Sequence, residues 1–316
     1  MKRLVASRNS LDIASRDLDV SRPTLISWLK KLASNTKTPL QVYKELKPQY
    51  GGILGIDGDW IKVAGDDRCI LVGVDHKTDV IANFEYAESE NSLDYKILIL
   101  TLIEMKYPFK GVVSDRNGSI KKWVEKLLPG IPHQFCIAHF MREVDSKIKY
   151  SYICKRLKGA KTRKSYDYFK DYYQPELIFH KKIYNILFAK TEKLARTRLN
   201  SLIKQRDKFP DHCQPFIISL VKDAPYLFRH FKVHGLPKTN NFTELKINQI
   251  ENRIKLIEGF QSDETAENFI RLLIHFLNSK KFTYAKKKHN FRNNKTPLQL
   301  AKSNLKTDDW LKLSQK

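Results

Sequence analysis

Residues 52–63 read Gly-Ile-Leu-Gly-Ile-Asp-Gly-Asp-Trp-Ile-Lys-Val, and this apolar run predicts a strand that ends or bends near Asp57. Two further strands are predicted at residues 69–75 and 79–86, with short turns between the strands. Strands spaced this closely are typical of an antiparallel meander. We therefore expect the main domain to begin with three sequential strands.

Helices and strands alternate after this meander. The pattern predicts an apolar helix, a short buried strand, a second helix, another short strand and a basic helix, at residues 93–105, 111–115, 119–128, 133–137 and from 139 onward. This order is that of a ribonuclease-H-like core, although many α/β domains share parts of it. We expect an α/β fold with a ribonuclease-H-like mixed sheet flanked by helices.

The remaining segments predict a core that is divided by an insertion and flanked by further parts. An N-terminal helix-turn-helix and a linker precede the core, and a helical insertion interrupts it. A solvated, basic arm that faces DNA follows the core, with a break at Thr296-Pro297. The expected bounds are 1–35 for the helix-turn-helix, 36–50 for the linker, 51–150 for the first part of the core, 151–235 for the insertion, 236–280 for the last part of the core, which carries Glu244, and 281–316 for the tail.

Two short helices around a tight turn are predicted at residues 10–18 and 22–32. Ser21 suits the N-cap of the second helix, and Pro23 suits its first turn. We expect this helix to bury Leu25, Trp28, Leu29 and Leu32. Its other face is polar and basic, and the residues expected to contact DNA are Arg22, Thr24, Ser27, Lys30 and Lys31. This is the pattern of a DNA-binding helix-turn-helix, and an ordinary helical hairpin is the alternative.

The composition bounds the class of protein. The chain has 316 residues, with 58 Lys and Arg against 34 Asp and Glu, so its formal charge is +24. Such an excess indicates a polyanionic partner, foremost nucleic acid, because neutralising phosphates releases counterions. The 41% of hydrophobic residues exclude a wholly disordered chain, and no apolar run is long enough to predict a membrane span. The four cysteines are scattered, which fits a reducing compartment, so we expect a cytoplasmic, nucleoid-associated protein.

The helical insertion is rich in aromatic and basic residues. Its densest stretch contains Tyr166, Tyr168, Phe169, Tyr172 and Tyr173 among lysines and arginines. Such a mixture can bind a nucleic-acid strand through phosphate pairing and base stacking. Aromatic side chains also carry most of the apolar area of a small core, and we expect that role for them here.

Three acidic residues are candidates for chemistry. Asp57 and Asp115 are expected at the ends of buried strands, where a carboxylate is costly without a partner such as a metal ion. Glu244 lies near the start of a later helix, whose polar face carries Glu244, Asn248, Glu251 and Lys255. Together they could hold two Mg²⁺ ions that act on a phosphodiester. Each acid alone could instead serve a turn or a helix dipole, and the acids that compete for these roles are Asp59, Asp75, Asp79 and Glu251.

Cys136 and His139 form a Cys-x-x-His pair after the second candidate aspartate. Two ligands cannot make a structural zinc site by themselves. We expect a packed cysteine next to a hydrogen-bonded histidine rather than a zinc centre.

These pieces together resemble the DDE transposases of the Mutator-type insertion-sequence superfamily. The matching pieces are Gly-Ile-Asp57-Gly, Val-Val-Ser-Asp115-Arg-Asn-Gly, Pro-His-Gln-Phe-Cys136-Ile-Ala-His139-Phe-Met-Arg142 and Thr-Asn240-Asn241-Phe-Thr-Glu244-Leu-Lys-Ile-Asn248, within residues 50–280. The resemblance implies that Asp57, Asp115 and Glu244 hold Mg²⁺, with Mn²⁺ as a substitute. It implies nicking at the ends of a mobile element, followed by attack of the freed 3′-OH on target DNA.

The resemblance also implies partners and supporting residues. Cys136, His139, Asn241 and Asn248 would support the site, and Arg142 would contact DNA. Independently of the resemblance, the charge of the basic tail predicts that Lys286, Lys287 and Lys288 contact DNA. The partners would be double-stranded DNA, as terminal inverted repeats and as target, bound by a dimer or higher oligomer, with no membrane involved. Two alternatives stay open: a DNA-binding protein derived from a transposase but without catalysis, and a ribonuclease-H-like nuclease or resolvase.

Overall fold

The structure is a computed structural model that describes residues 5, 10–257, 260–285 and 287–316. The chain divides into two compact units. The sheet unit comprises the chain up to Val112 together with residues 118–131 and 241–316, and the helical unit comprises residues 113–117 and 132–240.

A five-stranded mixed sheet with the order β3-β2-β1-β4-β5 confirms the α/β class. Its strands are β1 (Ile53–Val63), β2 (Asp66–Asp75), β3 (Ile81–Ala87), β4 (Gly111–Ser114) and β5 (His133–Phe135). The predicted meander is confirmed, because β1 pairs with β2 and β2 with β3 in antiparallel fashion. The division between the two units falls within β4.

The prediction that the first strand ends near Asp57 is wrong. β1 continues to Val63, and Asp57 lies within it, paired with Val72. The hairpin turns at Ala64 and Gly65, whose φ angles are 53° and 94°. A two-residue hairpin turn requires positive φ at such positions, so the strand can end only there.

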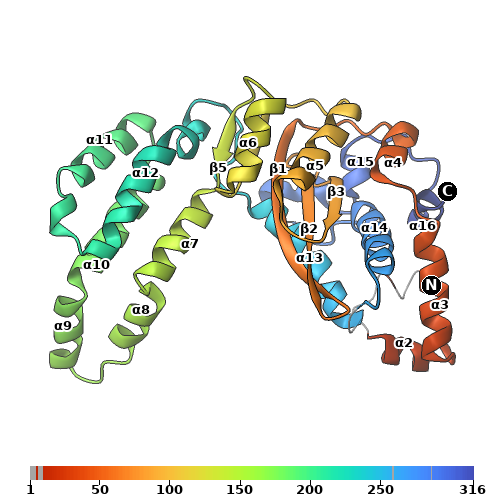
Figure 1. Ribbon diagram of the computed structural model, residues 1–316, viewed down its shortest axis with the longest axis horizontal. Helices are drawn as coiled ribbons and strands as arrows, with labels where there is room; N and C mark the ends of the chain where they lie inside the picture. The colour runs from red at the N-terminus through yellow and green to blue at the C-terminus, as the bar shows by residue number, and fades with distance from the viewer. Residues whose placement is uncertain (1–4, 6–9, 258–259, 286) are drawn as a thin grey trace. The chain divides into compact units, whose positions relative to one another are not determined.

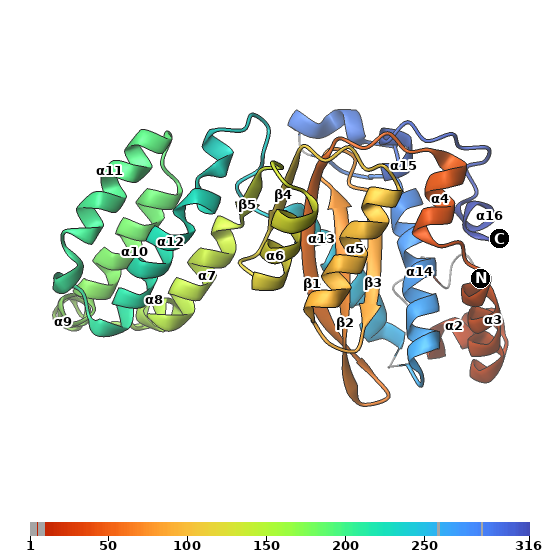
Figure 2. The same ribbon diagram turned by 45° about the horizontal axis from the view of Figure 1, so that its top comes forward.

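Both faces of the three-stranded meander are covered within the sheet unit. On one face lie α5 (Ser92–Glu104) and α6 (Gly118–Leu127). Leu54 and Ile56 of β1 belong to the core between these helices and the sheet. On the other lie α13 (Asn241–Ile254) and α14 (Asp263–Ser279), with Ile61 and Val63 of β1 in that core. Figures 1 and 2 show these helices on opposite sides of the strands. Side chains of successive strand residues point to opposite faces, so odd-numbered residues of β1 face α13.

The N-terminal segment forms α2 (Leu11–Leu18), α3 (Arg22–Ser34) and α4 (Pro39–Leu46). The predicted cap is confirmed, because the Ser21 side chain accepts from the Thr24 amide at 3.3 Å. The predicted burial of Trp28 is wrong: it is 43% exposed, because α3 packs against α14 through Leu25, Leu29 and Ala33. The predicted 36–50 linker is also wrong in part, since α4 lies within it, opened by a capping box.

The prediction that residues 281–316 form a solvated arm is wrong. This segment contains η5 (Lys287–Arg292), α15 (Pro297–Leu300) and α16 (Trp310–Ser314). Leu298, Ala301 and Leu313 pack with Leu46 and Val80 in a small buried cluster. Enough apolar area is buried there to hold the tail on the sheet unit despite its many lysines.

Residues 151–235 are helical, as predicted. The helical unit contains α7 (Ile137–Lys147), α8 (Tyr150–Lys158), α9 (Arg163–Tyr172), α10 (Gln174–Leu187), α11 (Glu192–Ile203) and α12 (Gln214–Leu227). Short 3₁₀ turns are η1 (Arg206–Lys208), η2 (Asp211–Cys213) and η3 (Arg229–Phe231) in this unit, and η4 (Lys255–Ile257) in the sheet unit. The unit has its own core, with Phe140, Phe179 and Leu220 among its buried residues. Within the described part of the chain, no helix is both long and apolar enough to cross a membrane.

Candidate functional site

Asp57 is a buried residue within the long strand β1. It is 8% exposed, and its Oδ1 accepts from the Gly58 amide at 3.1 Å. As an odd-numbered residue of β1 it lies on the face that α13 covers, opposite Val72 in the register. The sequence predicts Asp57 at a strand end, whereas in the structure it lies within β1, on the face that α13 covers.

Glu244 lies in the first turn of that helix and is half-buried. α13 packs against β1 and β2 through Ile247 and Ile250, which are buried. Asp57 and Glu244 therefore belong to facing elements of one unit. The other supporting residue predicted on this helix, Asn248, is exposed.

Asp59 and Glu251 form a second acidic pair between the same two elements. Both line one small gap between β1 and α13. Burial and repulsion from Glu251 raise the pKa of Asp59 above its ordinary value, and Lys255 opposes this. Lys255 forms an ion pair with Glu251 at 2.6 Å. Asp57 and Asp59, which compete in the sequence for the role of metal ligand, therefore lie next to each other on one face of β1.

Asp59→Asn is expected to stabilise the protein slightly at neutral pH. A raised carboxyl pKa means that the ionised form is disfavoured in the folded state, so its cost appears as the pH rises above the ordinary pKa of aspartate. Because Asp59 is only half-buried, solvent screens the effect, and we expect a gain in Tm of about 1–2 °C. Thermal unfolding of both proteins near pH 7 measures this gain. The gain should vanish at about pH 3, where Asp59 is protonated, and a gain that persisted there would contradict the charge argument.

Asp75 and Asp79, two other competitors, are occupied by structural contacts. Asp75 is fully buried and accepts from the amides of Gly51, Gly52 and Thr78 and the hydroxyls of Thr78 and Tyr107. Asp79 pairs with Arg292 at 2.5 Å. These contacts give both acids a structural role, so neither needs a metal ion to account for its position.

Asp115 directly follows β4, as predicted. It is half-buried in the helical unit, and its Oδ1 accepts from the Asn117 amide at 3.0 Å. The next residue, Arg116, forms ion pairs with Glu143 and Asp223. Through Arg116, these ion pairs tie the loop that carries Asp115 to α7 and α12.

Cys136 and His139 belong to the start of α7 in the helical unit. Cys136 is fully buried, as expected, and its Sγ accepts from the Asn240 amide at 3.2 Å. The next amide, of Ile137, donates to the Lys238 carbonyl at 3.1 Å. Cys136 and the Ile137 amide therefore anchor the segment that runs directly into α13. A thiolate and an imidazole suit zinc better than Mg²⁺, so the pair differs in donor chemistry from the three carboxylates.

The buried asparagine of the Thr-Asn-Asn motif is Asn240, which sequence reasoning missed. Asn241, the predicted supporting residue, is exposed at the first position of α13, whereas Asn240 is fully buried. Two adjacent asparagines cannot both point inward at a helix start. The two consecutive asparagines were the available sequence signal for a buried amide at this helix start. Only the backbone structure shows which of the two is buried.

The predicted DNA-contacting residues are spread over several surfaces. In the helical unit, Arg142 is exposed and lines an open groove of about 650 Å³ along α7, together with His139, Lys147, Lys149 and Phe216. In the sheet unit, Ser27 and Lys31 of α3 are exposed and Thr24 is half-buried. Arg22 and Lys30 line a cavity of about 400 Å³ beside α3, and Arg22 pairs with Asp12 at 3.1 Å. In the tail, Lys287 is exposed, Lys288 falls within η5, and Lys286 lies outside the described residues.

Comparison with known proteins gives no assignment. No protein-family model matches the chain, and no curated protein sequence matches it.

Proposed function

We propose that this chain is a metal-dependent DNA transposase that nicks the ends of a mobile element and joins the freed 3′-OH to target DNA. The observation that carries the proposal is the placement of Asp57 on β1, beneath the helix whose first turn holds Glu244. Asp115 follows β4, the strand next to β1 in the sheet order. A ribonuclease-H-like core, in which strands and one helix present acids to a phosphodiester, accounts for this placement.

The donor set fits the proposed ions. Asp57, Asp115 and Glu244 offer carboxylate oxygens, which are the ligands that Mg²⁺ and Mn²⁺ prefer. When bound, two such ions activate water or a 3′-hydroxyl and stabilise the leaving oxygen. The nearly complete burial of Asp57 supports this use, because a buried carboxylate needs strong compensation.

Other residues of the chain serve binding and support in this proposal. Cys136 holds the segment before α13 through Asn240, and so sets where the helix with Glu244 begins. Arg142 and the lysines of the α7 groove contact DNA phosphates. The net charge of +24 fits two DNA partners, the terminal repeats and the target, bound by a dimer or higher oligomer.

The test uses the DNA that flanks the protein's own coding sequence, because an insertion element encodes its transposase between its ends. We expect the purified chain, with Mg²⁺ or Mn²⁺, to produce nicks with 3′-OH ends and to join those ends to a plasmid. Specific binding without cleavage under either ion would favour a DNA-binding protein without catalysis. Hydrolysis of branched or hybrid duplexes without joining would favour a nuclease or resolvase.

A further inference from the structure

The α8–α9 hairpin exposes aromatic side chains that the sequence assigns to a core. No residue of α9 is buried, and all of its residues are described. Tyr168 and Tyr172 are 63% and 65% exposed, and Tyr152 of α8 is 46% exposed. The core of the helical unit is built mainly from α7, α10, α11 and α12. The prediction that Tyr168 and Tyr172 belong to the core is therefore wrong, and their exposure needs another explanation.

The exposed rings rest on one another. Tyr168 and Tyr172 lie nearly parallel, with ring centroids 6.3 Å apart and planes inclined by 21°. Tyr172 meets Tyr173 edge-on at 4.8 Å, and Tyr173 meets Tyr152 at 6.4 Å. Arg156 lies over the ring of Tyr152 and donates to its hydroxyl at 2.8 Å. The rings therefore contact one another in sequence and form one aromatic surface on the hairpin.

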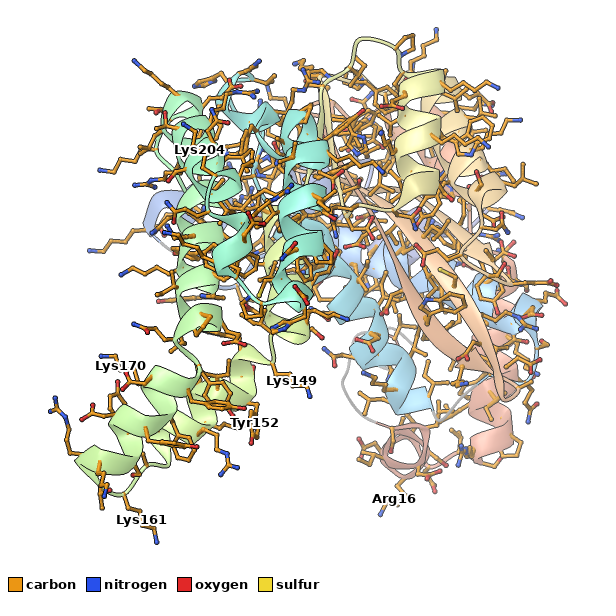
Figure 3. All side chains as sticks on the ribbon, turned by 60° about the vertical axis from the view of Figure 1, so that its left-hand side comes forward. Arg16, Lys149, Tyr152, Lys161, Lys170 and Lys204 are labelled. Atoms are coloured by element: carbon orange, nitrogen blue, oxygen red, sulfur yellow. The ribbon has the colours of Figure 1, made fainter. Side chains whose placement is uncertain are left out.

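This aromatic surface is surrounded by positive charge. Residues 147–173 contain nine lysines and arginines against two aspartates, and one of these, Asp167, pairs with Arg163 at 3.1 Å. Figure 3 shows Lys149 and Tyr152 at one end of the hairpin, Lys161 at its tip and Lys170 along α9, with the lysine side chains extending outward. A surface of this charge repels basic partners and attracts phosphates.

We propose that the α8–α9 hairpin binds an unpaired segment of DNA, with bases stacked on Tyr168 and Tyr172 and phosphates held by the surrounding lysines. Base pairs inside a duplex already stack on one another, so rings on a protein surface gain most from unpaired bases. A duplex would need the lysines alone and would leave the rings exposed. This inference extends the proposed function, because it specifies that the bound DNA is unpaired. It rests on the proposed function in taking the mobile element or its target as the source of that DNA.

The experiment measures binding by fluorescence anisotropy of a labelled oligothymidine of about 20 nucleotides, which spans several stacking positions. It uses the full chain in EDTA, and a duplex of equal length serves for comparison. We expect the double variant Tyr168→Ala and Tyr172→Ala to bind the single strand about ten-fold or more weakly, because each stacked base contributes a large factor to affinity. Duplex affinity should stay within about two-fold, since phosphate contacts are kept.

Three comparisons make the result decisive. The variant Tyr168→Phe and Tyr172→Phe keeps both rings and should keep single-strand affinity. Tyr184→Ala, on α10, removes a tyrosine outside the hairpin that is 47% exposed, and should have no effect. The absence of single-strand binding by the wild type, an unchanged affinity of the double alanine variant, or an equal loss on the duplex would each overturn the proposal. Because no metal is present, this failure is distinct from a failure of the catalytic proposal, which only the cleavage assay measures.

Discussion

Asp115→Asn is expected to reduce metal-dependent cleavage and strand transfer by about a thousand-fold or more, because such reactions depend on the charge that metal ions neutralise. Asparagine has the shape of aspartate, but it is neutral and a weaker ligand for Mg²⁺. Its amide oxygen can still accept the hydrogen bond from the Asn117 amide that Asp115 accepts at 3.0 Å. The substitution should therefore remove chemistry and leave the loop folded.

The measurement is the rate of nicking and joining on labelled element ends, beside Tm and DNA affinity in EDTA. Asp57→Asn and Glu244→Gln should show the same loss with the same retained binding. Asp59→Asn is the matched control, because Asp59 lies two residues from Asp57 on the same face of β1. Full activity of Asp115→Asn, or loss of activity in Asp59→Asn alone, would show that the metal ligands are assigned wrongly.

The order of strands and helices could be predicted from the sequence because each apolar run is short and punctuated by turns. The length of β1 could not, since Asp57 and Asp59 interrupt its apolar pattern. Antiparallel pairing with β2 carries the strand past both acids to the turn at Ala64 and Gly65. The pairing register and the turn geometry decide where a β-strand ends. Neither can be predicted from the hydropathy pattern of that strand alone.

The helices within the predicted linker and tail carried a readable signal. Residues 38–41 and 296–299 both read Thr-Pro-Leu-Gln, and each opens a helix through a capping box. Threonine at the N-cap, proline in the first turn and glutamine at the third position are a helix start. At Thr296 the surrounding lysines favour a solvated tail, in which the same Thr-Pro pair predicts a break instead of a helix start.

The candidate acidic residues could be named from the sequence, but the sequence could not distinguish candidate metal ligands from acids that stabilise the fold. Asp75 resembles Asp57 in the sequence, because each is an aspartate in an apolar run. The partners of Asp75 lie up to 32 residues away, at Gly51, Gly52 and Tyr107. Only the folded chain shows that Asp75 is committed to the fold. The exposed tyrosines of α9 escaped prediction for a related reason, because burial depends on neighbours that the local pattern does not name.

Asp75→Ala is expected to destabilise the protein by about 3–5 kcal/mol, among the largest effects of a single substitution. The carboxylate is fully buried and accepts hydrogen bonds at 2.7–3.1 Å from three amides and two hydroxyls. Alanine would leave these donors buried without an acceptor, and each such donor costs about 1–3 kcal/mol before relaxation. Burial and the charge of Asp75 raise the pKa of Tyr107 well above its ordinary value, so that hydroxyl remains a donor at all relevant pH values.

Urea unfolding of the full chain measures this loss. Asp67→Ala, on the same strand, is the control: its ion pair with Lys62 is exposed, and we expect a change within about 0.5 kcal/mol. Tyr107→Phe removes one of the five donors and should cost about 1 kcal/mol. A loss below about 1 kcal/mol in Asp75→Ala would contradict the assigned role, because an alternative partner would then have to satisfy those donors.

The two aspartate variants separate chemistry from folding. Asp75→Ala should lose activity too, but in proportion to the fraction unfolded, and activity should return under stabilising conditions such as sulfate or low temperature. Asp115→Asn should stay inactive under those conditions, because its fold is already intact. If both variants recovered together, Asp115 would be a structural residue like Asp75, and the carboxylate proposal would lose one of its three members.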